Sequence, residues 1–216
     1  MLLPAAAGRV SRAREAAAGS QILAGLRVVW SDRRLRGLIV ITAVYNFFLM
    51  GLPFVATPVY VREVLDGRPE TYAYLQAVYA GGMLPGIAIA HWLSRRIRLG
   101  RLILLGIILD GLTYMPFFFI RSVPTAMLFM GVHSVVIPII MVPRTTLVQR
   151  LVARELWGRA FSILNVCVIG FAALSSGLIG VVAEFVPVSW IFLVFGGLVA
   201  LVGAAGFLDR DFSSAG

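Results

Sequence analysis

The sequence is 216 residues long, 60% hydrophobic and only 13% charged, with a formal net charge of +9 and a mean hydropathy of +0.93. A soluble domain is typically about half apolar and about a quarter charged, and at this length it has too little interior to bury so much apolar surface. The composition therefore excludes an ordinary soluble domain. The lipid bilayer is the solvent that fits it.

The first 36 residues are predicted to form a cytoplasmic linker with an amphipathic helix. Apolar side chains recur there at helical spacing opposite Arg27: Ile22, Leu23, Leu26, Val29 and Trp30. A helix of this kind suits the cytoplasmic surface of a membrane. A solvated linker with a short helix is the alternative.

Six transmembrane helices follow. A bilayer core needs about 20 mostly apolar residues in a helix. The stretches that meet this requirement are 38–58, 72–93, 102–120, 123–142, 161–183 and 188–207. Four of them contain proline, and we expect kinks rather than breaks there because neighbouring helices can satisfy the freed carbonyls. Residues 37–208 are therefore predicted to form a six-helix transmembrane bundle, and residues 209–216 a cytoplasmic tail.

The arginines predict the orientation of the bundle. All 19 basic residues are arginine. Sixteen of them fall on one side of the predicted membrane and three on the other: Arg62, Arg68 and Arg121. Arginine-rich loops stay in the cytoplasm, so both chain ends are predicted to lie inside. The chain is thus expected to be an all-α, multi-pass protein of the inner (plasma) membrane. Arginines that mark loops do not make a nucleic-acid-binding face, and no nucleic acid partner is expected.

Ionisable residues at membrane depth are costly and are by default functional candidates. Asp110 lies near the middle of the third stretch and His133 near the middle of the fourth, so both are candidates for proton coupling. A carboxyl bonded to a neighbouring helix and a neutral histidine with one partner are the structural alternatives. Asn46 and Asn165 lie deep in the first and fifth stretches, where each can bond a substrate or another helix.

Enzymatic motifs are missing from the sequence. It has no Gly-x-x-x-x-Gly-Lys phosphate loop. Its two histidines are widely separated, and Cys167 is the single cysteine, so neither a zinc cluster nor a haem site nor an intrachain disulfide is predicted. No Ser-His-Asp arrangement can be argued from the spacings. We therefore expect no catalytic residue, no metal and no cofactor, and an enzyme is not favoured.

The connecting segments carry a family resemblance. Residues 143–149 (PRTTLVQ) and 155–162 (ELWGRAFS) resemble the segment between the tenth and eleventh helices of major facilitator superfamily transporters, particularly the exporters of siderophores and macrolides. Residues 25–36 are similar to the central cytoplasmic linker of that branch. Residues 86–101 resemble the loop between helices eight and nine, although Ala90 stands where the superfamily usually has Asp. The resemblance covers about residues 21–210, the C-terminal half of such a transporter.

This resemblance implies a half bundle of the major facilitator type, in which helices seven, eight, ten and eleven line a midplane cavity. Four residues thereby become candidates for the substrate cavity: Asn46, Gln76, His133 and Asn165. Four others belong to the cytoplasmic loop motif: Arg144, Gln149, Gly158 and Arg159. Asp110 falls on helix nine, which is usually peripheral.

The resemblance also implies a function. It favours a secondary active transporter that exports a small organic molecule, driven by protons. One six-helix half cannot alternate by itself, so the chain is expected to be a half or a fragment. It would need a second six-helix half, either another copy in a homodimer or a separate N-terminal half. The alternative is a non-transporting six-helix module that binds or regulates another membrane protein.

Overall fold

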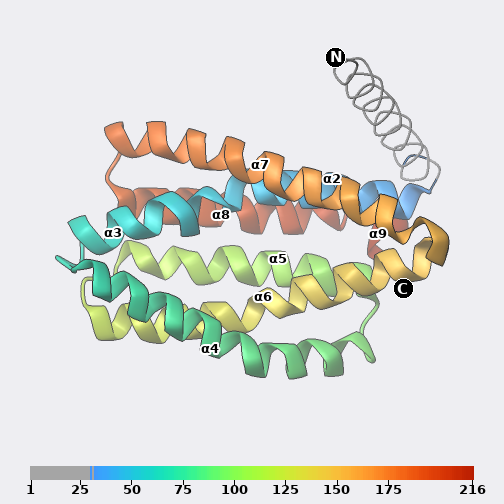
Figure 1. Ribbon diagram of the computed structural model, residues 1–216, viewed down its shortest axis with the longest axis horizontal. Helices are drawn as coiled ribbons and strands as arrows, with labels where there is room; N and C mark the ends of the chain where they lie inside the picture. Colours follow the sequence, from blue (N-terminus) through green and yellow to red (C-terminus); the bar gives the residue numbers. More distant parts are fainter. Residues whose placement is uncertain (1–29, 31) are drawn as a thin grey trace, which may run out of the picture.

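The computed structural model describes Trp30 and residues 32–216. The elements in chain order are α2 (Arg33–Leu49), η1 (Leu52–Ala56), α3 (Thr57–Glu63), α4 (Pro69–Ser94), α5 (Leu99–Tyr114), η2 (Met115–Phe118), α6 (Val123–Leu151), η3 (Arg154–Leu156), α7 (Trp157–Phe185), α8 (Val188–Gly206) and α9 (Arg210–Ser213). Within these residues all regular structure is helical, and six segments are long and apolar enough to span a membrane (Figure 1). The predicted all-α fold with six transmembrane helices is confirmed.

The first span begins earlier than predicted. Asp32 is the N-cap of α2, and its side chain accepts hydrogen bonds from the backbone N–H groups of Arg34 and Leu35 at 2.7 and 3.3 Å. Such a cap stabilises a helix by about 1 kcal/mol, so α2 starts at Arg33, before the apolar stretch predicted at 38–58. Apart from Trp30, the predicted amphipathic helix of the linker lies outside the described residues.

A wide turn divides the first span. The segment η1 is a π-helical turn that contains Pro53, and α3 continues beyond it. Proline cannot donate the usual backbone hydrogen bond, and a π-helical turn takes up the resulting mismatch. The Thr57 hydroxyl donates to the Leu52 carbonyl at 2.9 Å. Pro85, Pro116 and Pro138 lie within three other spans and leave them unbroken, as predicted.

Two helices lie at the flanks of the bundle. In Figure 1, α7 runs along one edge and α4 along the other, with α2, α5, α6 and α8 between them. The chain buries only 11% of the apolar window of α7 and 17% of that of α4, against 44–50% for the other four spans. The flanking helices therefore expose most of their surface to lipid or to another protein.

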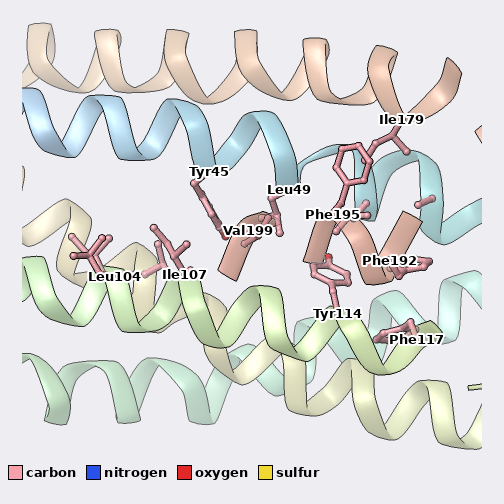
Figure 2. Packing of buried hydrophobic residues seen from close by; sticks show 14 of the residues in the cluster. Tyr45, Leu49, Leu104, Ile107, Tyr114, Phe117, Ile179, Phe192, Phe195 and Val199 are labelled. Atoms are coloured by element: carbon pink, nitrogen blue, oxygen red, sulfur yellow. The ribbon is translucent and has the colours of Figure 1, made fainter. Parts of the chain in front are cut away.

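An aromatic cluster joins the first, third and sixth spans near the C-terminal end of α5. Phe192 of α8 lies 5.3 Å from Tyr60, 5.4 Å from Phe117 and 5.8 Å from Tyr114, measured between ring centroids. Figure 2 shows Tyr114, Phe117 and Phe192 gathered between α5 and α8. The Tyr60 hydroxyl donates to the Ile120 carbonyl at 2.7 Å, so the polar group of this buried ring is satisfied.

The contact between α4 and α6 depends on small residues. A Cβ atom on Gly82 would overlap Ser134 Oγ and lie 2.7 Å from the Gly131 carbonyl oxygen, whereas one on the adjacent Gly81 would meet nothing within 4 Å. The two helices can therefore approach this closely only because residue 82 has no side chain.

Gly81 and Gly82 give a matched test of the packing between α4 and α6. We expect Gly82→Ala to lower the free energy of unfolding by about 1–3 kcal/mol, the usual cost of overpacking. Gly81→Ala should be neutral or stabilise by up to about 1 kcal/mol, since alanine favours the helix. Unfolding in mixed micelles measures both values. Equal effects of the two substitutions would contradict the close contact.

The predicted cytoplasmic tail folds back on the bundle. The side chain of Asp209 caps α9 by accepting from the Phe212 backbone N–H at 3.0 Å, and Phe212 and Ala215 are buried. The backbone N–H of Gly100, in the first turn of α5, donates to the Ala215 carbonyl at 3.0 Å. This hydrogen bond therefore links the C-terminal tail to the first turn of α5.

The start of α2 and the C-terminus lie at the same end of the bundle, together with the α4–α5 and α6–α7 connections (Figure 1). These are the arginine-rich segments, so this end is cytoplasmic by the positive-inside rule.

In a Cys167→Ser background, we expect impermeant thiol reagents to label Arg68→Cys and Ser122→Cys from outside the cell. Arg95→Cys and Arg154→Cys should react only from the cytoplasmic side. Labelling of position 68 from the cytoplasm would overturn this topology.

Candidate functional site

A cavity of about 270 Å³ lies among α2, η1, α3, α4, α5, α6 and α7. Aromatic side chains and methionines form much of the cavity wall. Its polar lining residues are Tyr45, Asn46, Thr57, Gln76, Tyr79, Tyr114 and Arg144. Among the described lining residues none is acidic, so Arg144 gives the cavity a positive charge.

A buried polar cluster lies beside this cavity. Asp110 on α5 and His133 on α6 are both fully enclosed, and His133 Nδ1 lies 3.3 Å from Asp110 Oδ1. The Tyr45 hydroxyl of α2 donates to Asp110 Oδ2 at 2.7 Å, and Figure 2 shows Tyr45 pointing from α2 toward α5. The two residues predicted as proton-coupling candidates are therefore neighbours, linked to three spans.

The hydrogen bonds assign the histidine proton. Thr113 Oγ1 donates its single proton to the Asp110 carbonyl at 2.8 Å, and it lies 2.9 Å from His133 Nδ1. Because a hydroxyl that donates to the Asp110 carbonyl can only accept from His133, we assign the hydrogen of the ring to Nδ1. The same N–H faces the carboxylate of Asp110. Asp110 Oδ1 has no hydrogen-bond partner among the described residues, and an unpaired carboxylate oxygen is costly in an apolar interior.

Two tyrosines connect the cluster to the cavity. The Tyr114 ring lies 4.1 Å from the His133 ring, and Tyr45 bonds Asp110 directly. Both tyrosines also line the cavity. The cavity wall and the Asp110–His133 pair therefore share contacts with Tyr45 and Tyr114.

The four cavity candidates are placed differently. Asn46 and Gln76 line the cavity. The side-chain amide of Asn46 donates to the Thr42 carbonyl at 2.7 Å, while its Oδ1 is buried without a partner among the described residues. His133 lies beside the cavity rather than in its wall. Asn165 is exposed on α7, where Val168 is the lining residue.

All four residues of the predicted loop motif are helical, whereas the resemblance implies a loop. Helix α6 continues to Leu151, so Arg144 and Gln149 lie in its last turns. Gly158 and Arg159 lie in the first turn of α7. Hydropathy falls at residue 142, but a helix can extend beyond the apolar core of a bilayer.

Arg144 lines the cavity, although it is predicted as part of the cytoplasmic loop motif. It follows Ile137, Ile140 and Met141 at helical spacing, and all four line the cavity. This periodicity was available in the sequence. The family resemblance instead places Arg144 in the cytoplasmic loop motif, and the arginine asymmetry places it on the cytoplasmic side.

The family is decided by comparison with known proteins. The profile of the Major Facilitator Superfamily matches residues 1–168 and, in a second overlapping match, residues 39–215. The chain belongs to the major facilitator superfamily. A search of curated proteins finds no match. The superfamily consists of transporters rather than enzymes, so the chain is a multi-pass membrane protein of a transporter family. Its cavity is lined by the first, second, fourth and fifth spans, with Tyr114 added from the third.

Proposed function

We propose that the chain forms one half of a secondary transporter that exports a small organic molecule in exchange for protons across the plasma membrane. Its segments at 143–149 and 155–162 resemble the siderophore and macrolide exporters. The observation that carries the proposal is the buried Asp110–His133 pair, hydrogen-bonded to a residue of the cavity wall.

Protonation of Asp110 changes what holds three spans together. As a carboxylate, Asp110 accepts from Tyr45 and faces the His133 N–H. Asp110 Oδ1 has no hydrogen-bond partner among the described residues, so a proton can bind there, and the resulting O–H donor then faces the N–H donor of His133. The link between α2, α5 and α6 then weakens. A proton thereby biases the packing of the spans that enclose the cavity, which is what coupling requires.

The flanking helices offer a surface for the other half. Six described glycines meet nothing within 4 Å, and five of them lie on the flanking helices: Gly81 on α4, and Gly158, Gly170, Gly177 and Gly180 on α7, with Gly197 on α8 as the sixth. Exposed small residues let transmembrane helices approach closely. We propose a second six-helix half as the occupant of this surface, and a second copy is tested first because one patch then serves both subunits. Asn165 would then face the shared cavity.

A proton-release assay tests the proposed function. Everted membrane vesicles containing the chain are energised, and a fluorescent probe follows the pH gradient. Cationic, neutral and anionic aromatic compounds are then added one at a time. We expect one charge class to dissipate the gradient in vesicles with the chain and not in empty ones. If no compound does so, the non-transporting interaction module is the better reading of the fold.

A further inference from the structure

Arg144 lies where a positive charge is costly. It is seven residues from the cytoplasmic end of α6, about 10 Å at the helical rise, and it lines the cavity. Its Nε is buried with no hydrogen-bond partner among the described residues, and none of them forms an ion pair with it. A buried, unpaired donor on a charged group loses free energy unless something binds it.

The rest of the wall does not supply that partner. The polar lining residues other than Arg144 are neutral, and the nearby carboxylate of Asp110 is already bonded to Tyr45 and faces His133. The guanidinium is therefore free to form a charge-assisted bond with an acid group that enters the cavity. Guanidinium matches the oxygens of carboxylates, phosphates and sulfonates through paired N–H donors.

The remaining lining residues favour an aromatic ligand of modest size. Four rings line the cavity (Tyr45, Phe54, Tyr79 and Tyr114), and so do three methionines (Met50, Met130 and Met141). Aromatic rings and thioethers both make favourable contacts with a ligand ring. The volume of about 270 Å³ suits a ligand with a single ring.

We infer that the cavity binds a small aromatic organic anion, whose acid group is held by Arg144. This inference rests on the proposed function, since it names the substrate class of the same cavity. Arg144 is then a specificity-determining residue, and it acts by direct contact with the ligand.

Two probes of nearly equal shape test the charge preference. Benzenesulfonate is a permanent anion, and benzenesulfonamide is its neutral counterpart. Calorimetric titration of the full chain in a neutral maltoside detergent measures both affinities. We expect benzenesulfonate to bind at least tenfold more tightly. Arg144→Gln should remove this preference, whereas Arg150→Gln, an exposed residue of the same helix, should leave it unchanged.

A second measurement needs no variant and is independent of folding defects. Phenylglyoxal modifies arginine, and mass spectrometry follows Arg144 and Arg150 separately. Benzenesulfonate should slow modification of Arg144 at least tenfold without protecting Arg150, and benzenesulfonamide should protect neither. The inference would be overturned by any of three results: benzenesulfonate does not bind, both probes bind equally, or benzenesulfonate does not protect Arg144. Arg144-dependent binding without proton release in the vesicles would refute the transport proposal alone. Proton release with cationic compounds only would refute the anion site alone.

Discussion

Asp110→Asn is expected to abolish proton release by the transported compound, with a loss of at least 100-fold, while the chain still folds and inserts. Asparagine keeps the shape of the side chain and can still accept from the Tyr45 hydroxyl. It cannot take up and release a proton, so the switch between two packings is lost. Everted vesicles with matched amounts of protein provide the measurement, and binding of the compound in detergent should change much less than proton release.

Two control variants separate coupling from structure. Tyr45→Phe removes the hydroxyl that donates to Asp110 but keeps the ring, and we expect an intermediate loss of proton release. Asp211→Asn changes an exposed carboxyl on α9, and it should have no effect on coupling. If Asp110→Asn couples normally, Asp110 is not the coupling residue. If the variant fails to insert, the carboxyl has a structural role of the kind expected for a peripheral helix.

Hydropathy and arginine asymmetry were enough to predict six helices in order. These patterns are local and strong, because a bilayer tolerates few charges and requires satisfied backbones. Helix ends were predicted less well. The predicted stretch ends at residue 142, whereas the helix α6 ends at Leu151. Hydropathy marks the edge of the apolar part of the bilayer and not the end of a helix. The cap at Asp32 likewise extends α2 beyond its apolar run.

The residues of the polar cluster were predicted individually, but their contact was not. Asp110 and His133 are separated by a turn and parts of two helices, and their spacing along the chain does not determine how α5 packs on α6. The alignment of α5 on α6 depends on close contacts such as the one at Gly106, where a Cβ atom would lie 2.7 Å from Ile140 Cγ1. The family resemblance placed Asp110 on a peripheral helix. In the structure α5 packs on both α8 and α6, its span is the most buried of the six, and the face with Asp110 points toward α2 and α6.

The second large effect concerns the partner. If two copies pair through α4 and α7, then Gly177→Trp should convert a dimer into a monomer, weakening association at least tenfold. A tryptophan at this position would occupy space that is empty in the single chain, since a Cβ there meets nothing within 4 Å. Small residues at a helix interface cannot be enlarged without separating the helices. Native mass measurement in nanodiscs reports the oligomeric state directly.

The matched control for this substitution lies on another helix. Leu201 of α8 is 65% exposed and belongs to neither flanking helix, so Leu201→Trp should leave the dimer intact.

The two-fold arrangement also predicts that Gly177→Trp abolishes proton release together with dimerisation, because a single six-helix half has no opposing half to rock against. A dimer that survives Gly177→Trp would place the interface elsewhere. A chain that stays monomeric but binds a different six-helix protein through α4 and α7 would replace the homodimer with a heteromer. A strictly monomeric chain with no such partner would contradict both forms of pairing and, with them, transport by this polypeptide.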